Sequence, residues 1–334
     1  MPLHPVDTLH ARKKADADAN FTYGIQLPPV ARQSPETPLA FPKRLPARWL
    51  AATAARLTFL SGVGYFAMAY TVSRFLTRAR RQRLRRGPEE LGLPCEPFTL
   101  TTGDGLALSG WLIEPPSPRG TVALFHGMRQ NREQMLSRMA FLYEAGYRCV
   151  AIDHRAHGES RGKRISFGWY EARDVSAVAK WIAERFPAEP RFALGISMGA
   201  AALSFAGPTC GWTKVILEGI YADLTLAFKR RIGACYPRWF GELYPAVMWI
   251  TQKRLRIRID QIRPAESIAR FGNTPILGIA GERDALAPPS DVYAVFRHVK
   301  STAQLHVVAG AGHNDMCETG DQLYRQRVLD FLEA

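Results

Sequence analysis

Cysteine is scarce and scattered in this chain of 334 residues. The five cysteines form no CxxC pair and no metal-binding spacing; they are Cys95, Cys149, Cys210, Cys235 and Cys317. An odd number of isolated thiols gives no support for a disulfide framework. It predicts free, mostly buried thiols in a reducing compartment, and it predicts no metal site.

Acidic residues are in short supply near the N-terminus. Residues 1–90 hold 15 Lys and Arg against 6 Asp and Glu, and the whole chain carries a net charge of +14. The basic excess therefore belongs mainly to this segment. It has no interleaved aromatics and no recognisable reading helix, so nucleic acid is not expected as a partner.

The first 94 residues divide by composition. Residues 1–48 lack a sustained apolar period and predict a disordered or loosely attached arm. Residues 49–76 predict an apolar helix, with Arg56 the one charge between positions 49 and 73. Residues 77–94 predict a basic linker that carries most of the arginines following the helix.

Two interpretations of the apolar helix stay open. It is long enough to anchor the chain in a membrane, with the following arginines, and so the domain that comes after them, on the cytoplasmic side. The arginines of the stretch 49–86 would also attract anionic headgroups at a membrane surface. In the alternative the helix packs on its own domain, and the protein is cytoplasmic. The helix starts too far from Met1 for a cleavable signal peptide.

Strand-like and helical runs alternate from Cys95 to the end. Residues 97–115 predict a hairpin around Gly103-Asp104-Gly105. Short apolar runs at 120–127, 148–153, 191–195, 214–219, 275–281 and 303–310 are typical of strands buried on both faces, with helical runs between them. This alternation predicts an α/β fold with a mostly parallel sheet, covered by helices on both faces. Function in such sheets collects at the carboxyl ends of the strands.

The stretch "GISMGA" at residues 195–200 lies where a predicted strand becomes a helix. A turn this sharp strains the backbone, and Gly195 and Gly199 remove the Cβ atoms that would clash. Ser197 would then project above the sheet, beside the free N–H groups of a helix N-terminus. The pattern predicts Ser197 as a nucleophile.

A serine nucleophile needs a base, and the base needs a group that orients it. Three histidines follow Ser197: His298 within a predicted helix, His306 within a predicted strand, and His313 in the loop "GAGHND". We expect His313 to be the base. Asp284 is favoured as the acid because it directly follows a buried strand, and Asp223 remains the alternative.

An oxyanion hole needs two backbone N–H donors, one of them from the residue after the nucleophile. We expect these donors to be Met198 and Met128, the latter in "FHGMRQN" at residues 125–131. His126, upstream of the serine, is interpreted as a loop-shaping residue.

These motifs together resemble the α/β-hydrolase superfamily, in its serine-aminopeptidase-like or monoacylglycerol-lipase-like branch. The resemblance covers residues 95–334, rests also on "DHRAHGES" at 153–160 and "GERDALAPP" at 281–289, and departs from the pattern at Ala156, where a glycine is usual. It implies a catalytic domain with an eight-stranded sheet and a helical lid at about 221–260. In that lid Phe228, Trp239, Phe240 and Tyr244 would bind substrate.

The predicted activity is that of a serine hydrolase that cleaves a carboxylic ester, of a lipid or another apolar acyl compound, through an acyl-enzyme without a cofactor. Two alternatives stay open: a peptidase or amidase with the same triad, and a catalytically silent, membrane-tethered binding protein.

Overall fold

The computed structural model describes residues 47–235, 237–299 and 302–334. The chain divides into two compact units, residues 1–55 and residues 56–334. The predicted arm lies outside the described residues except for its last two positions, which belong to helix α1 (Ala47–Thr77).

An eight-stranded sheet forms the centre of residues 56–334, with strand order β1-β2-β4-β3-β5-β6-β7-β8. β1 and β2 form the predicted hairpin, β2 pairs antiparallel with β4, and all other neighbours are parallel. The predicted mostly parallel eight-stranded sheet is confirmed. The strand bounds are β1 Glu96–Thr101, β2 Ala107–Ile113, β3 Thr121–Phe125, β4 Arg148–Ile152, β5 Arg191–Ile196, β6 Lys214–Glu218, β7 Ile276–Gly281 and β8 Ala303–Val308.

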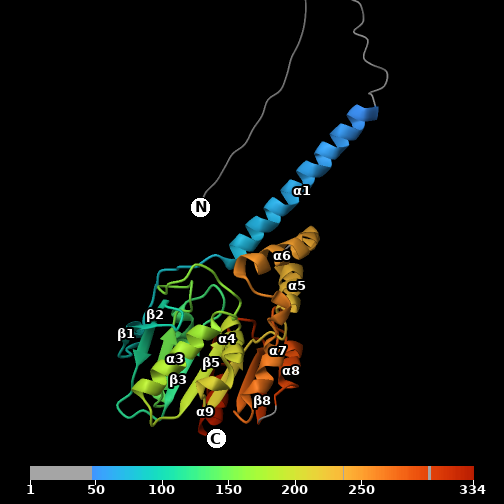
Figure 1. Cartoon of the computed structure of the whole chain (residues 1–334). Coiled ribbons are helices and arrows are strands. Elements are labelled where there is room, and N and C mark those ends of the chain that lie inside the picture. Colours follow the sequence, from blue (N-terminus) through green and yellow to red (C-terminus); the bar gives the residue numbers. More distant parts are fainter. Residues whose placement is uncertain (1–46, 236, 300–301) are drawn as a thin grey trace, which may run out of the picture. The chain divides into compact units, whose positions relative to one another are not determined.

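Helices cover both faces of the sheet. Alternate residues of a strand point to opposite faces, so Leu124 of β3 packs in the cluster that contains α2 (Leu136–Glu144) and α9 (Met316–Glu333). Its neighbour Ala123 packs in the cluster of α3 (Ala172–Arg185), α4 (Met198–Ala206) and α8 (Pro289–Phe296). Figure 1 shows α3 and α4 side by side across one face.

The predicted insertion between β6 and β7 is helical. It contains α5 (Leu224–Cys235), a 3-10 helix (Arg238–Leu243), α6 (Tyr244–Leu255) and α7 (Pro264–Ser267). Its apolar residues form a cluster of their own, which includes Phe228 and Val247 and reaches Phe167 and Ala69 outside it. The insertion thus has its own small core. The remaining 3-10 helices are Pro88–Leu91, Arg132–Met135, Gly207–Cys210, Ile259–Gln261 and Ile268–Phe271.

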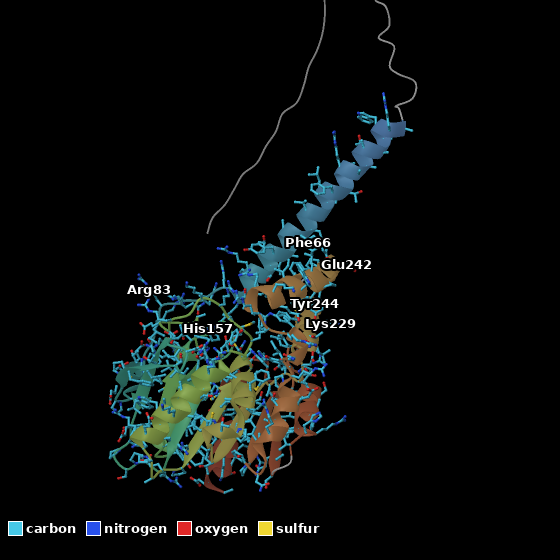
Figure 2. The ribbon with its side chains drawn as sticks, in the orientation of Figure 1. Phe66, Arg83, His157, Lys229, Glu242 and Tyr244 are labelled. Atoms are coloured by element: carbon cyan, nitrogen blue, oxygen red, sulfur yellow. The ribbon has the colours of Figure 1, made fainter. Side chains whose placement is uncertain are left out.

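The second part of α1, from Arg56, contacts this insertion. The Tyr65 hydroxyl donates to the Glu242 carbonyl at 2.8 Å, near Phe66 and Glu242 as labelled in Figure 2. The buried Ser73 and Thr251 hydroxyls are 2.9 Å apart. None of the helices in the described ranges is both long and apolar enough to cross a bilayer, so the predicted spanning segment is not supported.

The arginine-rich segment after α1 is hydrogen-bonded to the loops that follow β3 and β4. The Arg80 amide donates to the Ala156 carbonyl at 2.7 Å, and the Arg86 amide donates to the Glu133 carboxylate at 2.8 Å. The Arg81 guanidinium also donates to the Gly162 carbonyl at 3.3 Å, but most of the arginine side chains in this segment are exposed. The exposed ones include Arg78, Arg81, Arg83, Arg85 and Arg86.

Candidate active site

Ser197 lies in the turn between β5 and α4. Its φ of 51° and ψ of −107° fall in a region that residues with a side chain rarely adopt. A Cβ on Gly195 would lie 2.6 Å from the Gly199 carbonyl carbon, and one on Gly199 would collide with the Phe125 carbonyl oxygen. Both flanking positions therefore require glycine, and the turn holds Ser197 in a strained backbone conformation.

Two further side chains meet the serine. His313 Nε2 lies 2.9 Å from Ser197 Oγ, and His313 Nδ1 lies 2.6 Å from a carboxylate oxygen of Asp284. Asp284 follows β7 and His313 follows β8, which are parallel neighbours, so their loops leave the same sheet edge. A carboxylate that accepts the Nδ1–H leaves Nε2 as an acceptor for the serine proton.

The two candidate acids lie in different surroundings. Asp284 is buried, and its second oxygen accepts from the amides of Leu286 and Ala287 at 2.8 and 2.9 Å. Asp223 instead accepts from the Leu226 amide at 3.0 Å in the first turn of α5, and it lies 3.3 Å from Arg263. The structure therefore brings Asp284, and not Asp223, to His313.

The other histidines that sequence reasoning weighed lie elsewhere. His306 is in β8, as predicted, whereas His298 is exposed beyond the end of α8 and not within a helix. His126 accepts the His154 amide at 3.0 Å through Nε2, and its Nδ1 lies 2.7 Å from the Gly127 carbonyl. Burial holds the pKa of His126 well below its usual value, so the ring is neutral and fixes the loop.

The expected oxyanion donors line the same cavity as Ser197. Met198 is the first residue of α4, and Met128 follows Gly127, at which a Cβ would lie 3.7 Å from Ser197 Cβ. Within the described ranges, neither the Met128 nor the Met198 amide donates to a protein acceptor. Both N–H groups are available to a negative oxygen.

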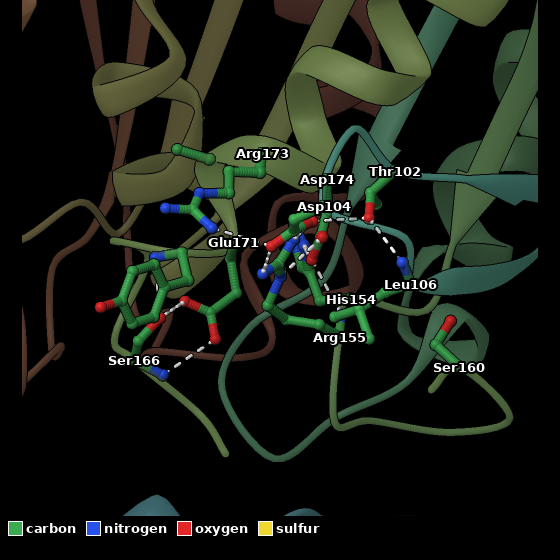
Figure 3. Close-up of polar contacts among 12 residues, drawn as sticks. Thr102, Asp104, Leu106, His154, Arg155, Ser160, Ser166, Glu171, Arg173 and Asp174 are labelled. Carbon is green, nitrogen blue, oxygen red and sulfur yellow. Dashed lines mark hydrogen bonds and ion pairs between the residues drawn. The ribbon is translucent and has the colours of Figure 1, made fainter. Parts of the chain in front are cut away.

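A buried polar network supports the loop after β4 (Figure 3). Asp174 of α3 accepts from the Arg155 amide and guanidinium, both at 2.8 Å, and burial raises its pKa to about 7 against the effect of Arg155. Glu171 accepts from the Ser166 and Gly168 amides, both at 2.9 Å. These bonds hold the chain around Phe167, which lines the cavity at Ser197.

The cavity at Ser197 has a volume of about 60 Å³. Of the four residues predicted to bind substrate, Phe228 lines it, whereas Phe240 and Tyr244 line a neighbouring cavity. The side chain of Trp239 lies outside the part that the structure describes. Sequence reasoning missed Phe167, Leu286 and Arg231. Only Leu286, two residues after Asp284, carried a local signal.

Comparison with known proteins gives a consistent picture. Residues 116–219 match the family described as serine aminopeptidase, S33. Protein YqkD of Bacillus subtilis is 27% identical over 71% of this chain and 78% of its own. A monoglyceride lipase homolog of Monkeypox virus is 24% identical over 65% of this chain and 89% of its own.

Solved structures agree with these sequence matches. The Pyrococcus furiosus esterase Pf2001 is 25% identical, with a TM-score of 0.65, over 77% of this chain and 97% of its own. The α/β-hydrolase GrgF of Penicillium is 21% identical, with a TM-score of 0.56, over 72% and 98%. The strand order of the sheet and the turn from β5 into α4 are those of the α/β-hydrolase fold. The chain has the α/β-hydrolase fold, and it is similar in sequence to members of the α/β-hydrolase superfamily.

Proposed function

We propose that the protein is a serine hydrolase that cleaves carboxylic esters of apolar acyl groups. The main observation behind this proposal is that His313 contacts both Ser197 Oγ, at 2.9 Å, and the Asp284 carboxylate, at 2.6 Å. The similarity to an esterase and to monoglyceride lipases supports the same reaction.

In the proposed mechanism Ser197 Oγ attacks the ester carbonyl carbon while His313 Nε2 takes the hydroxyl proton. The tetrahedral oxyanion accepts hydrogen bonds from the Met128 and Met198 amides. His313 then gives its proton to the leaving alkoxide, and the alcohol departs from the acyl-enzyme. Water repeats the sequence on the acyl-enzyme, which releases the carboxylic acid and restores the serine.

Three observations bear on the two alternatives. The side chains around Ser197 include Met128, Phe167, Leu224, Phe228 and Leu286, which suit an apolar acyl group better than a peptide backbone with its many polar groups. The strained turn and the short hydrogen bonds also count against a catalytically silent binding protein, because a binding surface needs neither.

The test compares Ser197→Ala with Ser204→Ala, which removes a buried hydroxyl from α4, the helix that follows Ser197. We expect Ser197→Ala to lower kcat on short p-nitrophenyl esters at least about 10³-fold. We expect Ser204→Ala to retain the parent rate. If both substitutions have the same small effect on kcat, the proposal is wrong. If the parent protein prefers amides over matched esters, the peptidase alternative is favoured.

We further propose that the protein works at a membrane surface, on the cytoplasmic side. Large apolar side chains of α1 are exposed, among them Phe59 at 71% and Leu60 at 62%. Exposed arginines follow them in the chain. An apolar helix face beside cations binds at the boundary between headgroups and acyl chains of anionic lipid.

A further inference from the structure

A second cavity, of about 340 Å³, lies between α1 and the helical insertion. One wall is α1, through Val72, Phe75 and Leu76. The facing wall belongs to α5 and α6, through Ile232, Tyr244 and Met248. Both walls therefore come from outside residues 116–219, where the family match lies.

This cavity adjoins the catalytic one. Phe228 and Arg231 of α5 line both, so the two spaces are separated by side chains of a single helix turn. The cavity at Ser197 has only about 60 Å³, whereas sites for small organic ligands span roughly 300–1,000 Å³. The catalytic cavity alone can hold the reacting group, and a longer chain must extend beyond it.

The walls of the second cavity suit an uncharged hydrocarbon. Its lining side chains are mostly aliphatic or aromatic. The Thr71 hydroxyl donates to the Ala67 carbonyl at 2.9 Å, which satisfies its donor. Arg231 is half-buried, and its apolar stem can line the space while its guanidinium reaches water.

The α1 wall is fixed by specific contacts. Ala69 is fully buried, Ser73 and Thr251 share a buried hydrogen bond of 2.9 Å, and Ile165 donates to the Thr77 carbonyl at 2.8 Å. These contacts lie on either side of Val72 along the helix. The cavity is therefore bounded by a helix that the fold holds in place.

We propose that this cavity binds the distal part of the substrate acyl chain, so that α1 determines the chain length the enzyme prefers. The inference rests on the proposed ester hydrolysis. The acyl chain runs from Ser197 past Phe228 into the space beneath Val72. Each methylene buried there contributes to transition-state binding, which corresponds to about a fourfold gain in kcat/KM per methylene.

The first experiment measures kcat/KM of the full chain on p-nitrophenyl esters from acetate to palmitate. Val72→Phe fills the cavity, and Val63→Phe makes the same change at an exposed position of α1 that does not line it. We expect Val72→Phe to lower kcat/KM at least about tenfold for acyl chains of about eight carbons or more, and to leave acetate unchanged. Val63→Phe should give the parent profile. An identical chain-length profile in parent and Val72→Phe overturns the inference.

A second experiment separates this inference from the proposed function. We expect the fluorescent fatty acid 11-(dansylamino)undecanoate to bind the Ser197→Ala protein. Adding Val72→Phe to this protein should weaken the binding at least about tenfold, whereas adding Val63→Phe should not change it. If the probe binds in this way but the parent hydrolyses no ester, the proposal for the second cavity stands and the proposed ester hydrolysis is wrong. If the parent hydrolyses esters but the probe does not bind, or binds equally well after Val72→Phe, the proposed function stands and the proposal for the second cavity is wrong.

Discussion

At the scale of single residues, the proposed nucleophile Ser197 has an unfavourable backbone conformation. A non-glycine residue in such a region costs about 1–3 kcal/mol. Ser197→Gly should therefore raise the free energy of unfolding above that of Ser197→Ala by about 1–2 kcal/mol, because only glycine relieves the strain. Urea unfolding of the two inactive variants measures the difference. A less stable glycine variant would mean that the turn is unstrained.

The choice between two aspartates is also a matter of single residues. Asp284→Asn should lower kcat about 10³–10⁴-fold, because the amide no longer selects the His313 tautomer that accepts the serine proton. Asp223→Asn removes a carboxylate from the start of α5, away from His313, and should leave kcat within about threefold of the parent. The reverse order of effects would assign the acid to Asp223.

Sequence reasoning could predict that Ser197, Asp284 and His313 lie together because chain order and flanking glycines restrict where such residues occur. It could not find the buried ion pair of Arg138 with Glu218, whose partners are 80 residues apart and carry no local pattern. Such pairs depend on which helix packs on which strand, which the local sequence does not show. Phe167 was missed because its place beside Ser197 also depends on how distant segments pack.

At the scale of secondary-structure elements, periodicity predicted the strands well because most are buried on both faces and form short apolar runs. Helix starts were predicted less well. Between the strands predicted at 120–127 and 148–153, the expected helical run begins as a 3-10 turn capped by Asn131, and α2 starts only at Leu136. Asp104 lies in the predicted hairpin turn. Its carboxylate accepts hydrogen bonds from the guanidinium groups of Arg155 at 2.8 Å and of Arg173 in α3 at 2.9 Å.

These hydrogen bonds to Asp104 predict a pH-dependent effect. The hydrogen bond from Arg155, aided by Thr102 and Arg173, lowers the pKa of Asp104 below its value of about 3.9 in the unfolded chain. Its contribution is therefore fully present above pH ~4 and is lost as the pH falls further, toward the folded pKa. Asp104→Asn should cost about 1–2 kcal/mol at pH 7 and clearly less at pH ~3.5.

Urea unfolding at the two pH values measures this difference. Glu184→Gln, which removes an exposed carboxylate 3.7 Å from Lys180 on α3, should cost under about 0.5 kcal/mol at both pH values. A deficit for Asp104→Asn that grows on acidification would contradict the account.

At the scale of the whole molecule, the uneven charge is the feature to explain. We expect the full chain to sediment with vesicles that contain phosphatidylserine and much less with pure phosphatidylcholine, and we expect salt to weaken the binding. The triple variant Arg81→Gln, Arg83→Gln, Arg86→Gln should bind about a hundredfold more weakly, at about 1 kcal/mol for each arginine.

The matched control neutralises three other exposed cations, Lys180, Arg185 and Arg325, and should bind as the parent does. Equal loss in both triple variants would indicate an effect of net charge alone. No sedimentation with either vesicle would contradict a membrane-surface location.

The central claim is that Ser197 is the residue that becomes acylated. The direct measurement is mass spectrometry of the protein after reaction with a fluorophosphonate, which mimics the tetrahedral intermediate and stays bound. We predict one adduct, on the peptide that carries Ser197, formed at least about 10²-fold more slowly in His313→Ala. An adduct on another residue, or none in a preparation that hydrolyses esters, would contradict the account.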